Sequence, residues 1–270
     1  MRALLLLVFL TLLGGPVHAA PEARLWPFWD RHDPASARTV DHDPWAGFLA
    51  DYVREGDDGV NRVAYADVTP ADKAALDSYV QVLAGLPIRS HGRDEQMAYW
   101  INLYNALTVR VILDHYPVDS IRDIDISGFF ADGPWGADLL TIEGQEVSLD
   151  DIEHRILRPI WRDPRIHYAV NCASIGCPDL QPEPFRAGDL DAQLDGAAGG
   201  YVNDQRGAAI EDGELVVSSI YEWFQEDFGG NEAGVNRHLK VHAGPELGPR
   251  LGAFSSIDDD RYDWSLNDAS

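Results

Sequence analysis

The residues best suited to chemistry in this sequence are its two cysteines, Cys172 and Cys177. They bracket a loop of mostly small residues, Cys172-Ala173-Ser174-Ile175-Gly176-Cys177. A cysteine is nucleophilic as its thiolate, which forms near neutral pH when a base or a positive field lowers its pKa. Two cysteines this close in sequence can also pair as a disulfide. The loop therefore predicts either thiol chemistry or a structural cross-link.

The structural interpretation is a disulfide between Cys172 and Cys177. A four-residue spacer can bring the two Cα atoms within ~7 Å, and an oxidising compartment would favour the bond. Closing so small a loop stabilises the fold little, so the bond would serve to fix the shape of the loop. A disulfide in the resting protein would not exclude thiol chemistry after reduction.

The chemical interpretation needs a base near Cys172, and His167 is the closest histidine in the sequence. Alternation over residues 165–171 predicts a strand that runs into the cysteine loop. Five residues of extended chain span ~16 Å, which exceeds hydrogen-bond reach. His167 is therefore expected to support the site rather than to act as the base.

His154 is the better candidate for the base. A helix is predicted over residues 149–157, and it carries Glu153 and His154. If this helix packs antiparallel on the predicted strand, its N-terminal half lies beside the end of the strand. We therefore predict Cys172 as the nucleophile and His154 as its base. Glu153 or Asn102 would orient that base.

Two other chemistries remain open at this point. A zinc ion would need four nitrogen and sulfur ligands, but the four-residue gaps here are unlike the tight pairs of most zinc sites. Its ligands would be His154, His167, Cys172 and Cys177. A serine nucleophile at Ser174 would sit in a run that imitates a nucleophile elbow but lacks its first glycine. No metal and no cofactor is predicted.

The strongest periodic segment, residues 94–115, predicts a helix that ends before Pro117. Asn102 and Asn105 lie three residues apart and share one side of this helix. Amides beside an apolar stripe are usually hydrogen-bond fixtures that hold a neighbouring loop, with a role in a pocket as the alternative. Asn105 and Asn171 are therefore expected around the site, in support of the reactive groups.

The remaining pattern indicates the fold class. Helices and short strands mix without a regular βαβ rhythm, so we predict an α+β fold, a mainly helical single domain with a small, mostly antiparallel sheet. The elements expected are helices near 44–54, 70–84, 188–204 and 218–228, hairpins at 139–148 and 208–217, and a last edge strand at 262–264.

Three segments are expected along the chain: a signal peptide at 1–19, an extended lead-in at 20–40 and a single domain at 41–270. The signal peptide is predicted from Arg2, an apolar run about half the ~20 residues of a membrane span, and small residues up to Ala19. The lead-in would pack through its aromatic side chains, Trp26, Phe28 and Trp29. We therefore expect a soluble protein of the periplasm or the exterior.

The charge balance restricts the possible partners. The sequence holds 45 acidic and 21 basic residues, a formal net charge of −24. Such a protein repels phosphate backbones and anionic lipid surfaces, which argues against nucleic-acid binding and membrane insertion. The partners expected are a small-molecule or peptide substrate of unknown identity and a thiol-redox partner.

Several motifs resemble the domain-of-unknown-function 547 (DUF547) family and together cover nearly all of the chain beyond the signal. They are Met97-Ala98-Tyr99-Trp100-Ile101-Asn102-Leu103-Tyr104-Asn105, Ser148-Leu149-Asp150-Asp151-Ile152-Glu153-His154, residues 166–178, residues 218–228 and the 262–267 tail. The family name implies no activity. Eukaryotic relatives that carry glutaredoxin-like domains on the same chain imply a link to thiol chemistry by association.

Two classes of function follow. The first is a thiol-dependent enzyme, either hydrolase-like or thiol-redox, that uses Cys172. The alternative is a non-catalytic binding or scaffold protein in which the Cys172–Cys177 disulfide fixes the loop. In that case four tryptophans would line a groove or fill the core: Trp100, Trp135, Trp161 and Trp223.

Overall fold

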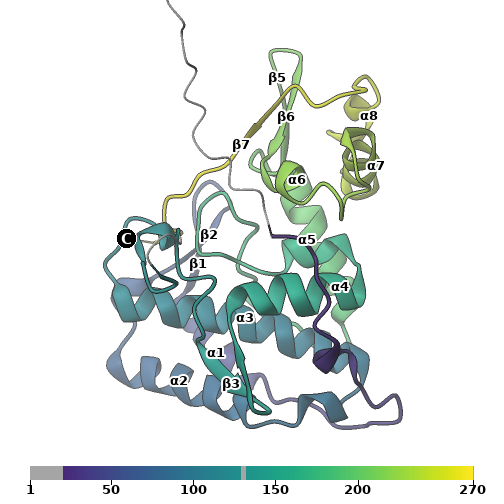
Figure 1. Cartoon of the computed structure of the whole chain (residues 1–270). Coiled ribbons are helices and arrows are strands. Elements are labelled where there is room, and N and C mark those ends of the chain that lie inside the picture. The colour runs from purple at the N-terminus through teal and green to yellow at the C-terminus, as the bar shows by residue number, and fades with distance from the viewer. Residues whose placement is uncertain (1–20, 129–131, 270) are drawn as a thin grey trace, which may run out of the picture.

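The computed structural model describes residues 21–128 and 132–269. Its central element is helix α3 (Arg93–His115), which agrees with the predicted helix and has buried side chains all round most of its length. Asp94 and Glu95 lie in its first turn, where negative charge is favourable. Figure 1 shows α3 in the middle of the larger, lower part of the molecule.

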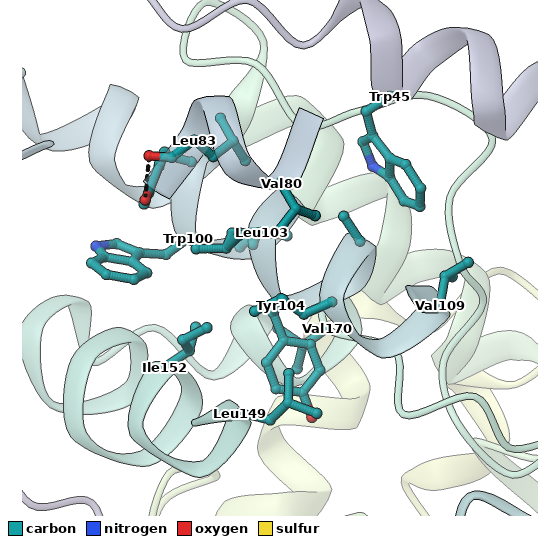
Figure 2. Close-up of a cluster of buried hydrophobic side chains, with 14 of the residues drawn as sticks. Trp45, Val80, Leu83, Trp100, Leu103, Tyr104, Val109, Leu149, Ile152 and Val170 are labelled. Carbon is teal, nitrogen blue, oxygen red and sulfur yellow. Dashed lines mark hydrogen bonds between the residues drawn. The ribbon is translucent and has the colours of Figure 1, made fainter. Parts of the chain in front are cut away.

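Two helices cover one side of α3. They are α1 (Asp43–Tyr52) and α2 (Pro70–Ala84), which matches the prediction for 70–84 at both ends. Thr69 caps α2, since its hydroxyl accepts a hydrogen bond from the Asp72 amide at 3.2 Å. Figure 2 shows the core between these helices, with Val80 and Leu83 of α2 facing α3.

Two hairpins were predicted and both are present. β3 (Leu140–Ile142) pairs with β4 (Gln145–Val147), and β5 (Ala208–Glu211) pairs with β6 (Glu214–Ser218), each antiparallel. Both turns have two residues with positive φ, as the tight hairpin turn requires: Glu143-Gly144 and Asp212-Gly213. A further hairpin joins β1 (Val53–Glu55) to β2 (Asn61–Val63).

The predicted edge strand at 262–264 is wrong in position. The last strand is β7 (Asp259–Arg261), and it pairs in parallel with β6. Beyond Arg261 the chain turns away from this sheet and runs, as the tail of residues 262–269, towards β2, where Asn267 accepts from the Val63 amide at 2.8 Å. Figure 1 shows this tail in yellow, leading from β7 down past β1 and β2.

The predicted strand at 165–171 is also wrong. Residues Pro164–Tyr168 form a 3-10 helix, and the side chain of Asp163 caps it by accepting from the Arg165 amide at 2.9 Å. Proline at the first helical position and a capping aspartate favour this tight turn. The helix-start signal of Asp163-Pro164 therefore outweighs the short alternation of apolar and polar residues that follows it.

The helix predicted over 149–157 is present in a different form. Residues Asp151–Leu157 form a π-helix that continues into α4 (Arg158–Trp161). Ser148 caps its start, accepting from the Asp151 amide at 3.1 Å. The helical segment does not end at 157 as predicted but runs on to Trp161, with Pro159 in the first turn of α4.

The remaining helices form the upper part of Figure 1. They are α5 (Leu190–Asn203), α6 (Ile220–Trp223), α7 (Glu232–His242) and α8 (Gly248–Leu251). The helix expected near 188–204 is confirmed, whereas that expected over 218–228 is reduced to α6 and turns. Neither α7 nor α8 was predicted. Short 3-10 helices lie at Pro27–Asp30, Tyr65–Asp67, Ile88–Ser90 and Ile121–Asp123.

The described residues contain two hydrophobic clusters. The larger surrounds α3, and the smaller gathers Tyr168 with side chains of α5, β6 and α7. Within these residues, three small sheets and a helical content well above the strand content confirm the α+β prediction. Within the described ranges, no helix is long and apolar enough to cross a membrane.

The lead-in packs through Trp29, whose buried ring meets Trp100 of α3 edge-on, with ring centres 5.0 Å apart. Its backbone is also fastened to the π-helix, since the Arg24 and Trp26 amides donate to carbonyls of that helix at 2.9 Å. A short 3-10 helix interrupts the extended course that was expected. The predicted signal peptide, residues 1–19, lies outside the described residues.

Candidate functional site

Both cysteines line a cavity of about 570 Å³. It lies where the two hydrophobic clusters meet, because its lining includes Tyr104 and Val170 of the larger cluster and Ile220 of the smaller. Cavities of this volume between packed units are the usual place for small-molecule sites.

The two sulfurs lie side by side. The Sγ atoms of Cys172 and Cys177 are 2.9 Å apart, beyond the ~2.05 Å of a disulfide, and both cysteines are free thiols in the structure. Cys172 is half-buried and borders the cavity, whereas Cys177 is buried. The disulfide stays a prediction, and the loop already holds the two thiols close enough to react with each other.

The two thiols have different surroundings. Cys172 Sγ lies within hydrogen-bond distance of Cys177 Sγ, and within 3.1 Å of the hydroxyls of Ser174 and Tyr262. These contacts, the Cys177 contact foremost, lower the pKa of Cys172 against the opposing effects of burial and the charge of Glu153. Burial and the neighbouring Cys172 raise the pKa of Cys177 well above its ordinary value. Cys172 is therefore the thiol that ionises first.

Amide side chains hold the loop from one side. Asn105 donates to the Ala169 carbonyl at 2.9 Å and accepts from the Asn171 amide at 2.8 Å. Asn171 in turn accepts from the Ala173 amide at 2.9 Å and donates to the Pro178 carbonyl at 2.7 Å. These bonds hold Ala173 at φ 60°, a conformation that residues other than glycine seldom adopt. Asn105 and Asn171 thus hold the backbone of the cysteine loop, and their supporting role at a reactive site stays a prediction.

The C-terminal tail holds the loop from the other side. The Ile175 and Gly176 amides donate to tail carbonyls at 2.8 Å, and the Asn267 amide donates to the Ala173 carbonyl at 3.0 Å. A Cβ atom on Gly176 would lie 2.6 Å from the Asp263 nitrogen, so this close approach requires glycine. The same contacts bring Tyr262 to the sulfur.

His167 is an ion-pair residue in this structure. Its Nε2 lies 2.7 Å from Asp227 Oδ2 and its Nδ1 lies 3.6 Å from Glu153 Oε1. Burial lowers the pKa of His167, but the two carboxylates outweigh burial and raise it. The ring stacks on Phe224 with centres 4.4 Å apart.

His154 is held neutral. Its Nδ1 accepts from Arg158 Nη1 at 3.0 Å, and its Nε2 lies 3.7 Å from Asp150 Oδ1. Burial, helped by the charge of Arg158, lowers the pKa of His154 to about 4. Burial raises the pKa of Glu153, between the two histidines, but His167 and Arg158 outweigh burial and lower it.

Both predicted histidines and Glu153 line the same cavity as Cys172. Within the described chain, however, the hydrogen bonds of the Cys172 thiol go to Ser174, Cys177 and Tyr262, and not to a histidine. His167 was expected to lie too far from Cys172 because residues 165–171 were predicted to form an extended strand. Residues Pro164–Tyr168 form a 3-10 helix instead. The prediction that His154 is the nearer histidine stays a prediction.

Asn102 does not line the cavity. Its amide donates to the Phe185 carbonyl at 2.7 Å and accepts from the Phe185 amide at 3.0 Å. Both polar atoms of the side chain are thereby occupied in holding the loop before α5. This is the fixture role expected for an amide on α3, and it leaves Asn102 no contact through which to orient His154.

The cavity residues that the sequence did not single out include Tyr104, Asp150 and Tyr262. Burial, with the charges of Glu153 and Asp151, raises the pKa of Asp150 to about 6. The Tyr104 side chain is buried, and its hydroxyl has no hydrogen-bond partner among the described residues. Figure 2 shows its ring directed away from α3.

The zinc and serine alternatives gain no support from the geometry. In residues 21–128 and 132–269, no group of three or more His, Cys, Asp or Glu side chains is arranged to hold a metal ion. Ser174 is buried, and its hydroxyl lies 2.9 Å from the Tyr262 hydroxyl and 3.1 Å from Cys172 Sγ. It therefore contacts the thiol rather than a base.

Residues 88–202 match the model of a family described as a protein of unknown function, DUF547. The match spans α3, the π-helix, the cysteine loop and nearly all of α5, and confirms the resemblance seen in the sequence. The motif at 218–228 and the tail lie beyond the matched residues. No curated protein matches the chain, and no solved structure does.

Proposed function

We propose that this protein, which belongs to the DUF547 family through residues 88–202, is an exported thiol–disulfide redox enzyme. Cys172 is the attacking thiol and Cys177 is the resolving thiol. The observation that carries the proposal is the pair of free sulfurs 2.9 Å apart at the cavity, with Cys172 at its edge and Cys177 buried behind it.

The reaction balances as an exchange of two electrons. The Cys172 thiolate attacks one sulfur of a substrate disulfide, forms a mixed disulfide and expels the other sulfur as a thiolate. Cys177 then gives its proton to the expelled thiolate and attacks the Cys172 sulfur, which breaks the mixed disulfide and releases the second substrate sulfur as a thiolate. The products are the Cys172–Cys177 disulfide, one substrate thiol and one substrate thiolate, which takes from solvent the proton that Cys172 gave up on ionising, so the protein is oxidised and the substrate reduced. The reverse sequence oxidises a dithiol.

Two features favour redox exchange over a hydrolase-like mechanism. A hydrolase needs a base on the nucleophile, but His154 is bound to Arg158 and His167 to Asp227. Redox exchange instead needs a low-pKa thiol that substrate can reach, with a second thiol behind it. Cys172, at the cavity and with a lowered pKa, meets the first need, and the buried Cys177 meets the second.

Export is part of the proposal and is supported by the pattern of residues 1–19, with a basic start, a short apolar run and small residues before Ala20. A dithiol exchanging with disulfides suits the periplasm or the exterior, where disulfides form. The proposal expects a mature chain that begins near Ala20. An intact Met1 on the working protein would contradict it.

The test counts thiols with 4,4′-dithiodipyridine, an uncharged disulfide that releases a thiopyridone followed by its absorbance. The reduced native protein should release two equivalents and end as an intramolecular disulfide with no reagent attached, as intact mass will show. The Cys177→Ser variant should release one equivalent and keep the reagent on Cys172.

The Cys172→Ser variant is the matched control. Its remaining thiol is buried, so it should release thiopyridone only after denaturation. The binding or scaffold alternative makes a different forecast. If both thiols of the native protein react slowly and alike, and each retains the reagent, Cys172 is not an exchange nucleophile and the redox proposal fails.

A further inference from the structure

We infer that the cavity selects substrates that carry a positive charge on an apolar body. The recognising surface is the aromatic wall, defined as Trp135, Trp223, Tyr262 and Trp264, together with the carboxylate of Asp150. This inference rests on the proposed redox function and adds its substrate class: disulfides with an ammonium or guanidinium group.

Among the charged side chains that line the cavity, the carboxylate of Asp150 is not balanced by a cation. Arg122 at the rim is paired with Asp132, and Glu153 faces His167, whose pKa the carboxylates raise, at 3.6 Å. Among the described residues Asp150 has no such cation, since the basic group paired with it is His154 at 3.7 Å, whose pKa is lowered to about 4. Of the described carboxylates that line the cavity, Asp150 is therefore the one without a cationic partner.

The aromatic wall suits a cation with an apolar body. Tyr262 contacts Trp223 and Trp264 with ring centres 4.8 and 4.6 Å apart, and Trp135 meets Trp264 at 5.9 Å. Ring faces attract cations through their quadrupole, and Arg122 already lies over Trp264 at 5.1 Å. The four half-buried rings thus offer both apolar surface and affinity for positive charge.

An unpaired hydroxyl beside Asp150 is independent evidence of a ligand site. Ser127 lines the cavity, and its Oγ is buried with no hydrogen-bond partner among the described residues. Gly136 lies between it and Asp150, since a Cβ atom there would be 3.8 Å from Ser127 Oγ and 3.7 Å from Asp150 Oδ2. A substrate ammonium at this point would pair with Asp150, and rotation of the Ser127 side chain would give its hydroxyl the partner that buried polar groups normally have.

The surface lies beside the reactive sulfur. Tyr262 belongs to the aromatic wall, and its hydroxyl is 3.1 Å from Cys172 Sγ. A ligand resting on the wall therefore has its disulfide near the attacking atom. Both the acidic residue and the thiol line one cavity of about 570 Å³, which suits a small disulfide or one peptide side chain and its neighbours.

The first experiment measures exchange rates with two small disulfides, cationic cystamine and neutral 2-hydroxyethyl disulfide. Each rate is divided by the rate of the same disulfide with free glutathione, which removes intrinsic reactivity. The normalised preference for cystamine should be about fivefold to tenfold in the wild type, the range expected for one ion pair and one cation–ring contact. Asp150→Asn should lower it towards one.

Asp138→Asn is the matched control, because it removes one exposed carboxylate that does not line the cavity. It should keep the preference of the wild type. If Asp138→Asn and Asp150→Asn lower the preference equally, the effect comes from net charge, and the inference is overturned.

A second experiment measures binding without any exchange reaction. Choline and its neutral isostere 3,3-dimethylbutan-1-ol are titrated while tryptophan fluorescence is followed, and choline should bind at least fivefold more tightly. Equal binding of the two compounds would refute the substrate class and leave the redox proposal intact. Selective choline binding in a protein whose Cys172 fails the thiol-counting test would refute the redox proposal alone.

Discussion

Tyr262→Phe tests the hydrogen bonds that stabilise the Cys172 thiolate. The substitution removes the hydroxyl that lies 3.1 Å from Cys172 Sγ and 2.9 Å from Ser174 Oγ. The ring keeps its contacts with Trp223 and Trp264, so the aromatic wall remains. Burial and the neighbouring sulfurs raise the pKa of Tyr262 well above its ordinary value, so the hydroxyl is a donor at any working pH.

The size of the effect follows from the contacts. A hydrogen bond to a charged group contributes about 1.5–3 kcal/mol, and about 1.4 kcal/mol corresponds to a tenfold change in an acid constant. Ser174 stays 3.1 Å from the sulfur and, freed from Tyr262, can still donate, so the lower end applies. Loss of a donor destabilises the thiolate, and the pKa of Cys172 should therefore rise by about 1.

The assay is the pH dependence of alkylation at Cys172 in the reduced protein, followed with iodoacetamide and peptide mass. The alkylation curve for Tyr262→Phe should move to higher pH by about one pH unit, the rise expected for the pKa of Cys172. Tyr52→Phe is the control, since its hydroxyl binds Asp72 outside the cavity. An unshifted curve in a Tyr262→Phe protein that unfolds at the wild-type urea concentration would refute the reasoning.

Two further predictions follow from buried polar groups. Tyr104→Phe should slow disulfide exchange yet leave the free energy of unfolding equal or slightly higher, because the lost hydroxyl lines the cavity and has no partner among the described residues; a loss of ~1 kcal/mol or more in urea unfolding would contradict this. Burial lowers the pKa of His42 and of His154 from 6.5 to about 4, so both bind protons more readily in the unfolded chain. Stability should therefore be complete above pH 6.5 and fall as the pH drops towards 4, and a constant urea midpoint across that window would contradict it.

The elements that the sequence predicted well carry their signals locally. Thr69-Pro70 marks the first turn of α2, and Asp212-Gly213 sets the turn of the hairpin between β5 and β6. The periodicity of α3 extends over six turns, so no single residue decides it. In each case the residues that fix the element are within a few positions of it.

The site was predicted in part for the same reason. The cysteine loop, Glu153 and His154 belong to one stretch of chain, and the structure brings them to one cavity. Asp227 and Tyr262 arrive from segments 60 and 90 positions away from their partners His167 and Cys172, and no spacing within the sequence indicates such contacts. The strand predicted at 165–171 differs from these cases, because the signal for the 3-10 helix that forms there, Asp163-Pro164, lies next to it in the sequence.

The hydroxyl groups of Ser174 and Tyr262 can adjust their hydrogen bonds to the reduced and the oxidised state of the two cysteines. In the reduced protein the Cys172 thiolate accepts from Ser174 and Tyr262, each at 3.1 Å. Once Cys172 bonds to Cys177 its charge is gone, and a neutral sulfur is a weak acceptor. The two hydroxyls lie 2.9 Å apart and one can then donate to the other, so oxidation leaves one hydroxyl hydrogen without an acceptor rather than two. In Tyr262→Phe the Ser174 hydroxyl again leaves one hydrogen without an acceptor in the oxidised state, so the oxidised state changes little. The variant should therefore lose stability mainly in the reduced state, through a weaker thiolate, and its reduction potential should fall in step with the rise in the pKa of Cys172.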